Sequence, residues 1–262
     1  MRALSTAATG MAAQQLNVEV ISNNIANMNT IGYKRQRAQF QDLLYQDMEQ
    51  VGSQSDASGT IVPTGLQIGS GVKAGSIYRI TQQGSMSQTS NPLDVAIQGQ
   101  GYFQVQLPSG ETAYTRAGNL AVNNTGEIVT SQGYPVLPAM TVPAGATNLV
   151  ISQSGLVSAT VPGQTTPQTL GQIQLASFVN EAGLEALGDN LFQVSGASGA
   201  AVVGLPTQNG LGSLLQGYTE ASNVDAVSEV TALIAAQRAY EMNSKVLTTA
   251  DQMLATTAQA KS

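Results

Sequence analysis

The sequence predicts a mixed α and mainly β protein. A helix from each end of the chain pairs as a coiled coil, and an extended β linker leads to a β-rich globular domain inserted between them. Three observations predict this fold. Apolar residues near both termini are spaced alternately three and four positions apart. The middle of the chain lacks that spacing. It instead carries short segments in which apolar and polar residues alternate, separated by Gly, Pro and Asn turns.

The stretch from Asp225 to Met253 has the clearest helical pattern, and neither Gly nor Pro interrupts it. In one stripe the residues are spaced alternately three and four positions apart. In a second stripe beside it, residues recur every seven positions. The first comprises Ala232, Ala235, Ala239, Met242, Val246, Thr249 and Met253; the second comprises Leu233, Tyr240, Leu247 and Leu254. Ser222 or Asn223 is the predicted N-cap of this helix.

A matching stripe lies at the other end of the chain, formed by Leu4, Ala8, Met11, Gln15, Val18, Ser22 and Ile25. Both stripes are rich in small or flexible residues, so either helix alone is marginal in water. We therefore expect the two termini to pair with each other and with copies of themselves. The alternative is two amphipathic helices packed on an ordinary globular core.

The first helix is predicted to end in an Asn-rich turn. Asn23, Asn24, Asn27 and Asn29 fall within seven residues, and Gly32 follows them. Asn competes for backbone hydrogen bonds and Gly accepts the left-handed conformation, so both residue types favour a helix end. The basic cluster at 34–37 is interpreted as a charged helix end or subunit contact, with phosphate or membrane binding as the alternative.

The domain boundaries follow from these patterns. Residues 1–33 and 222–262 form the terminal helical domain, and residues 34–95 and 205–221 form an extended loop and hairpin linking region. Residues 96–204 form the β-rich outer domain, where Phe103, Val105 and Leu107 alternate and Ser154-Gly155 marks a hairpin. Gly, Ser, Asp and Pro are dense at 52–64, which indicates a loop.

Composition excludes several classes of function. The 262 residues include no Cys and no His, which removes disulfides, zinc–thiolate sites and Ser–His nucleophiles. The net charge is −6 without a long basic block, which argues against nucleic acid as a partner. Only 10% of residues are charged, so a surface rich in amides and hydroxyls suits burial against copies. No run reaches the length of a transmembrane helix, and the first residues lack the apolar core of a cleaved signal peptide.

We expect no catalytic residue, no cofactor and no metal. The carboxylates of the middle region form no recognised pair or motif: Asp94, Glu111, Glu127, Glu181, Glu185 and Asp189. Ser70 and Lys73 have the SxxK spacing of Ser–Lys acylases, but the companion SDN and KTG motifs are absent, so this match is interpreted as chance.

Two segments resemble the signatures of the flagellar axial protein family, which comprises rod, hook and hook-associated subunits. Residues 22–27 with Thr30, Gly32, Tyr33 and Lys34 are similar to the N-terminal signature, and residues 236–241 with Asn243 and Lys245 to the C-terminal one. Further segments at 34–37, 42–45, 65–69, 94–97, 99–105, 114–116 and 216–218 resemble the rod members. The resemblance covers nearly the whole chain and is weakest about 141–170.

The resemblance implies a structural subunit at the distal end of the rod, a rigid helical tube that transmits torque from motor to hook and encloses the export channel. Its implied partners are further copies, proximal rod proteins, the hook protein and the outer ring bushing. Export is expected without a cleaved signal, into a rod that spans the periplasm. A rod-type insertion near 46–64 is expected to stiffen the rod by bridging neighbouring subunits.

The resemblance also assigns residues to self-assembly. From the N-terminal seam and signature these are Leu4, Ala8, Met11, Val18, Asn23, Asn24, Ile25, Asn27, Gly32, Tyr33 and Lys34. From the C-terminal seam they are Leu233, Ala235, Ala239, Tyr240, Met242, Val246, Leu247, Met253 and Leu254. The alternatives are a sister axial protein (a proximal rod or short hook subunit), a peptidoglycan-hydrolysing rod accessory, and an adhesin.

Overall fold

The computed structural model describes residues 2–49, 65–163 and 166–259, and these residues divide into two compact units. The described residues of 1–25, 36–78 and 226–262 form unit 1, and those of 26–35 and 79–225 form unit 2. The chain crosses between the units four times, so neither unit is a continuous segment of sequence.

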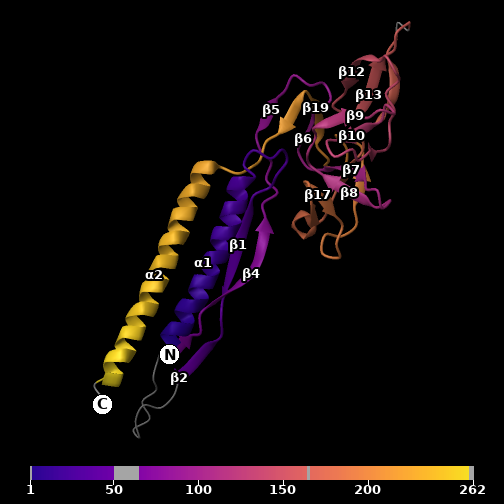
Figure 1. The fold of residues 1–262 in the computed structure, drawn as a ribbon. Coiled ribbons are helices and arrows are strands. Elements are labelled where there is room, and N and C mark those ends of the chain that lie inside the picture. The colour runs from indigo at the N-terminus through magenta and orange to yellow at the C-terminus, as the bar shows by residue number, and fades with distance from the viewer. Residues whose placement is uncertain (1, 50–64, 164–165, 260–262) are drawn as a thin grey trace. The chain divides into compact units, whose positions relative to one another are not determined.

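Unit 1 contains two long helices, α1 (Arg2–Ala26) and α2 (Ala226–Gln259), which lie side by side (Figure 1). Two strand pairs complete it: β1 (Gln36–Asp42) with β4 (Val72–Arg79), and β2 (Tyr45–Glu49) with β3 (Leu66–Gly69). The predicted helices at both ends of the chain are therefore confirmed, and so are the extended segments after the first helix.

Unit 2 is built from short strands in several sheets. The largest sheet has seven strands in the order β16-β17-β8-β7-β15-β18, with β11 also paired to β7. Its strands are β7 (Tyr102–Gln106), β8 (Thr112–Thr115), β11 (Val136–Leu137), β15 (Leu175–Ser177), β16 (Glu185–Gly188), β17 (Leu191–Gln193) and β18 (Val202–Gly204). The β-rich region expected between the terminal helices is thus confirmed.

Smaller sheets surround this one. A three-stranded sheet contains β12 (Thr147–Ile151), β13 (Leu156–Thr160) and β14 (Gln168–Gln172). Three strand pairs are β9 (Leu120–Val122) with β10 (Ile128–Thr130), β6 (Val95–Gln98) with β19 (Ser213–Gln216), and β5 (Met86–Gln88) with β20 (Tyr218–Glu220). A short 3-10 helix, η1, spans Glu181–Gly183.

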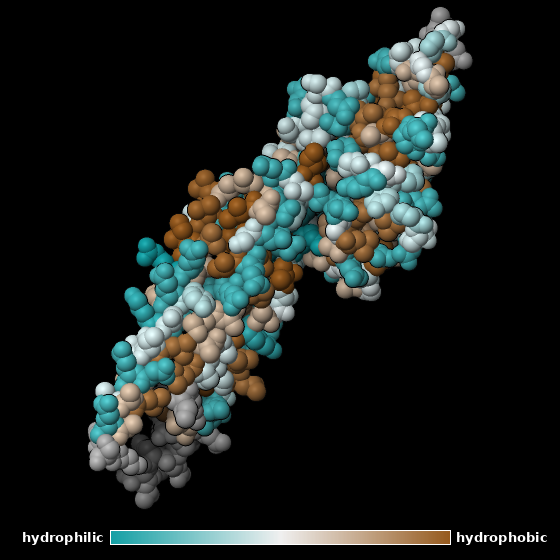
Figure 2. Space-filling model, viewed as in Figure 1, coloured by the Kyte–Doolittle hydropathy of each residue, from teal (hydrophilic) through white to brown (hydrophobic). Residues whose placement is uncertain are grey.

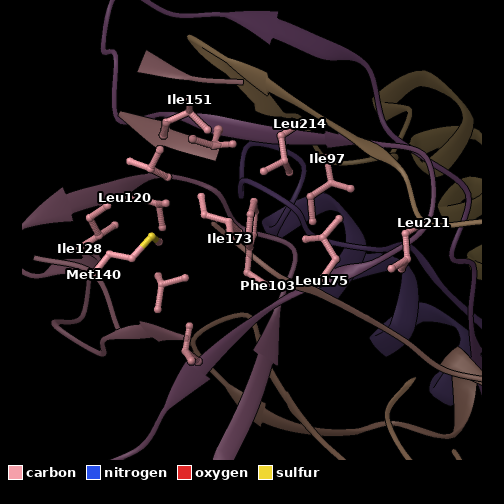
Figure 3. Packing of buried hydrophobic residues seen from close by; sticks show 14 of the residues in the cluster. Ile97, Phe103, Leu120, Ile128, Met140, Ile151, Ile173, Leu175, Leu211 and Leu214 are labelled. Carbon is pink, nitrogen blue, oxygen red and sulfur yellow. The ribbon is translucent and has the colours of Figure 1, made fainter. Parts of the chain in front are cut away.

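The main core of unit 2 gathers around Phe103 (Figure 3). Phe103 and Val105 point from one face of β7 into this core, where they are fully buried. Tyr102 points to the other face, into a second cluster in which its ring meets Phe178 and Phe192 edge to face. Both faces of β7 are therefore covered. The predicted alternation of Phe103, Val105 and Leu107 is confirmed, since Leu107 also packs, partly buried, against the main core.

Two local predictions have different outcomes. The hairpin at Ser154-Gly155 forms between β12 and β13, and Gly155 has a φ of +85°. The predicted N-cap is wrong, because α2 begins at Ala226 and Ser222 and Asn223 precede it. The Asn223 amide instead accepts from the Arg35 backbone N at 2.7 Å and donates to the Ile80 carbonyl at 2.9 Å. The Asn223 side chain therefore makes long-range hydrogen bonds instead of capping the helix that follows it.

Candidate self-assembly surface

The contact between α1 and α2 in unit 1 is fixed near one end by a buried polar pair. Asn24 on α1 and Glu229 on α2 are each only 1% exposed. The Asn24 Nδ2 donates to Glu229 Oε2 at 3.1 Å and to the Gln36 carbonyl at 2.8 Å, and Asn24 Oδ1 accepts from the Gln36 backbone N at 2.9 Å. One carboxamide therefore joins α1 to both α2 and β1, which explains why Asn, rather than an apolar residue, occupies this buried position.

Small residues let the elements of unit 1 approach closely. A Cβ added to Gly10 of α1 would lie 2.9 Å from Asn243 Nδ2 of α2. On a neighbouring part of α1, Thr9 Oγ1 accepts from the Val72 backbone N of β4 at 3.3 Å. Hence α1 is packed on both α2 and the β1–β4 pair.

The predicted N-terminal seam lies beside the most buried face of α1. The buried apolar residues of this helix are Ala7, Ala13, Val20 and Ile21. Of the seam residues, Leu4, Met11, Val18 and Ile25 are half-buried, and Ala8 is exposed. The seam is therefore only partly covered within a single chain.

The predicted C-terminal seam is still more exposed. Glu229, Ala236 and Ala250 are the buried residues of α2. Leu233, Ala239 and Leu247 are half-buried, whereas Ala235, Tyr240, Met242, Val246, Met253 and Leu254 are exposed. The face that meets α1 in the single chain is thus rotated from the predicted stripe, and most of that stripe stays accessible.

Large apolar side chains gather on the accessible surface of α2. They include Val227, which is 76% exposed, together with Val230, Ile234, Met242, Val246 and Met253. In Figure 2 the hydrophobic colour is concentrated over the N-terminal half of α2. Large exposed apolar patches mark interaction surfaces, so the outer side of α2 is the leading candidate for contacts with other chains.

The turn after α1 belongs to unit 2 and is held by its own hydrogen bonds. Thr30 donates through Oγ1 to Asn27 Oδ1 at 3.1 Å, and the Tyr33 backbone N donates to the Thr30 carbonyl at 3.2 Å. Gly32 has a φ of +71°, and a Cβ at that position would lie 2.9 Å from the Ala117 backbone N. Only glycine fits this turn without strain. Asn23, which lies on α1 itself, is exposed.

Lys34 belongs to a buried charge cluster in unit 2 that sequence reasoning did not find. The Glu220 Oε1 accepts from Lys34 Nζ at 2.5 Å, and Glu220 Oε2 accepts from Arg116 Nε at 2.6 Å. The Gly84 backbone N also donates to Glu220 Oε1, at 2.9 Å. Lys34 is therefore a buried ion-pair partner, which corrects its interpretation as part of a charged helix end or subunit contact.

Hydrogen bonds to the backbone stabilise the buried charges of this cluster further. Arg116 donates to the carbonyls of Gly101, Ile97 and Gly99, at 2.6, 3.1 and 2.5 Å. Burial by itself raises the pKa of Glu220, but Arg116 and Lys34 outweigh it and hold that pKa below its usual value. The sequence signal for a special role of Glu220 is its isolation, because residues 190–219 carry no charged side chain.

Two of the carboxylates considered for catalysis make separate hydrogen bonds. Asp94 lies near Asn91, which donates to it at 3.0 Å, and Glu181 Oε2 accepts from the Tyr102 hydroxyl at 3.2 Å. Across residues 2–49, 65–163 and 166–259, no group of three or more Asp or Glu side chains could hold a metal ion. Neither helix is long and apolar enough to cross a membrane in the part of the chain that is described.

Comparisons with known proteins match both ends and the middle of the chain to flagellar families. Residues 4–34 match the flagella basal body rod protein family, residues 96–159 the flagellar hook protein FlgE/F/G D1 domain, and residues 215–260 the flagellar basal body rod FlgEFG protein C-terminal family. The matched ends contain most of α1 and all of α2, which are the elements that carry the candidate surface.

Full-length relatives agree with these family matches. The chain is 68% identical to the flagellar basal-body rod protein FlgG of Caulobacter vibrioides, over 100% of both chains. It is 53% identical to the FlgG of Agrobacterium fabrum and 40% identical to that of Bacillus subtilis, each over 97% of both chains. Taken with the helices at both ends and the β-rich region between them, these matches establish that the chain belongs to the flagellar basal-body rod protein FlgG family.

Proposed function

We propose that this chain is a structural subunit of the flagellar distal rod, which polymerises into a rigid helical tube and catalyses no reaction. The observation that carries the proposal is the identity of 68% over the full length of a relative named as a basal-body rod protein. The exposed apolar side of α2 supports it independently, because a polymer subunit must have surface to bury against its neighbours.

The terminal helices are the proposed assembly elements, acting as a coiled coil that is completed between copies. Ala235, Met242, Val246 and Met253 repeat at helical spacing and are exposed in the single chain. In the polymer, copies would cover this stripe. Since long helices with little buried surface are marginal alone, we expect α1 and α2 to order fully only on assembly.

Three regions are proposed to have distinct roles in the tube. Residues 1–33 and 222–262 would form the inner layer around the export channel, residues 96–204 the outer layer, and residues 34–95 and 205–221 the link between them. Within the link, β2 and β3 pair directly and expose Tyr45, Met48 and Leu66. These exposed side chains support a contact with neighbouring subunits in this region.

The rod-type insertion expected at 46–64 lies largely outside the described residues, which stop at Glu49 and resume at Gly65. We propose that it stiffens the rod by bridging subunits. Rods from a strain with residues 46–64 deleted should bend like hooks in electron micrographs. Straight, stiff rods from that strain would contradict this role.

The proposed partners are further copies of this chain, the proximal rod proteins, the hook protein and the outer ring bushing, in a rod that crosses the periplasm. Export would use the flagellar type III route, without a cleaved signal peptide. The proposal includes no nucleic-acid partner.

The test is deletion of the gene in the source bacterium, followed by electron microscopy of purified basal bodies. A truncated rod, no hook and lost motility are the expected result. An intact rod with a missing hook would place the chain in the hook instead. Unchanged basal bodies would reject a rod function altogether.

A further inference from the structure

A polar pocket of about 250 Å³ lies within unit 2. The turn after α1 contributes to it, together with the loop between β8 and β9, the turn after β10 and the turn between β16 and β17. Thr115 and Leu191 are buried lining residues, whereas Asn29 and Asp189 are exposed. The pocket is therefore assembled from segments that are far apart in sequence and that only the fold brings together.

Neutral hydroxyl and amide side chains dominate the pocket. They belong to eight of the twelve lining residues, three others are aliphatic, and the last, Asp189, is acidic. None of these twelve described residues is basic or aromatic. A phosphate would therefore meet a carboxylate without any positive charge, and a nucleobase would find no ring to stack on. One carboxylate also falls short of the several ligands that a metal ion requires.

Some polar groups of the pocket hold its walls together, and others are available to a ligand. Asn190 Nδ2 donates to the Ile31 carbonyl at 3.1 Å, and Thr115 Oγ1 donates to the Asn190 carbonyl at 2.9 Å. These bonds fix the β16–β17 turn against the turn after α1. In the part of the chain that the structure describes, three lining side chains make no hydrogen bond within the chain: Asn29, Asn119 and Asp189.

The turn between β16 and β17 does not itself require the carboxylate of Asp189. Asp189 and Asn190 form this two-residue turn, and both have left-handed backbone conformations, with φ of +51° and +60°. Glycine adopts this conformation with the least strain. The Asn190 amide anchors the turn, whereas the Asp189 carboxylate has no partner in the described chain and lies at the pocket.

We propose that this pocket binds one ring of a neutral saccharide. Sugar hydroxyls both donate and accept hydrogen bonds, as do the amide and hydroxyl groups of the lining. The Asp189 carboxylate would accept from two adjacent hydroxyls, and the Asn29 and Asn119 amides would bond to others. The pocket is smaller than the roughly 300–1,000 Å³ of sites for drug-sized ligands, so it suits a single ring. This binding is separate from the proposed rod function, because it requires no polymer.

Nuclear magnetic resonance of the isotope-labelled full chain tests the proposal. The probes are a trimer of N-acetylglucosamine, which represents cell-wall glycans, and maltotriose, which represents glucose polymers. At least one probe should shift the backbone amide signals of Thr115, Ser131 and Leu191, with a Kd on the order of 1 mM. The probe that binds more tightly identifies the source of the sugar.

Two pocket variants test which groups hold the sugar. Asp189→Gly and Asn119→Ala should each weaken binding by about tenfold, because each removes a group that bonds to a sugar hydroxyl. Neither should lower the melting temperature, since neither side chain has a partner within the described chain and glycine suits the φ of residue 189.

The controls match each change outside the pocket. Asn209→Gly puts glycine at another exposed residue of unit 2 with a φ of +51°, and Glu185→Gln removes a charge from the β16–β17 hairpin. Both should bind the saccharide as the wild type does.

The inference is overturned if neither saccharide shifts the pocket signals, if the shifts map to other residues, or if both pocket variants bind as tightly as the wild type. A neutral peptide with blocked ends is the comparison ligand. If it shifts the pocket signals and neither saccharide does, the pocket is a peptide site and the inference is wrong.

Discussion

Asn24 and Glu229 are buried together where α1 meets α2, and the amide of the first donates to the carboxylate of the second at 3.1 Å although 205 positions separate them in sequence. The pair therefore joins the two ends of the chain. A buried polar pair of this kind fixes one register of two helices, because sliding either helix would leave a polar group without its partner.

Replacing Asn24 by Asp tests this register. Asp keeps an acceptor for the Gln36 backbone N but puts a second carboxylate beside Glu229, so the assembled polymer should lose on the order of 3 kcal/mol of stability per subunit at neutral pH. The measurement is thermal dissociation of the polymer followed by light scattering. Equal stability of the wild type and the variant at neutral pH would show that the pair does not hold the helices.

Glu220 should make the folding of unit 2 sensitive to acid. Its pKa in the folded chain is lowered below the usual value, so the unfolded chain binds more protons in that range. The stabilisation from Glu220 is therefore complete above the unfolded pKa of about 4.3 and is lost as the pH falls through the folded pKa.

Glu220→Gln should remove that acid dependence and cost about 3–5 kcal/mol at neutral pH, because it leaves Lys34 and Arg116 buried without a counter-charge. Urea unfolding of the full chain, followed by tyrosine fluorescence, measures both effects. The exposed Glu185→Gln is the matched control and should change little. Indistinguishable pH profiles for Glu220→Gln and the wild type would refute the assignment.

The lack of a side chain at Gly10 should allow α1 and α2 to approach closely. A Val side chain at this position would collide with Asn243, so Gly10→Val should weaken assembly. Gly10→Ala combined with Asn243→Ala should instead stabilise the helices by about 1 kcal/mol, since Ala favours a helix over Gly and the contact has been cleared. Helical circular dichroism of the polymer against temperature compares the variants. If Gly10→Val melts at the wild-type temperature, the close approach of Gly10 to Asn243 does not contribute to assembly.

Leu233 and Leu247 should be needed for assembly but not for the folding of unit 2. Both are half-buried on α2 in unit 1, and neither belongs to the main core of unit 2. Changing both to Asp should block rod formation while the β-sheet circular dichroism of the chain persists. The paired control is Thr231→Asp with Thr248→Asp, two exposed positions on the same helix. Normal rods from the leucine variant would contradict the predicted seam.

The local sequence pattern was sufficient to predict several of the helices and strands. The spacing of apolar residues near both ends gave α1 and α2, and alternation punctuated by glycine gave β7 and the β12–β13 hairpin. These predictions succeed because helical period, strand period and turn conformation depend on residues close in sequence. The absence of Cys and His likewise excluded whole classes of chemistry without any structure.

Only the tertiary structure decided which residues distant in sequence contact one another. Periodicity places Ala235, Met242 and Val246 on one stripe, but it does not say that α1 covers Ala236 and Ala250 instead. In the same way, Lys34, Arg116 and Glu220 come from three separate segments, and no local rule brings them together. The physical reason is that a buried charge or amide must find its partner wherever the folded chain supplies one, so its position depends on the packing of the whole unit.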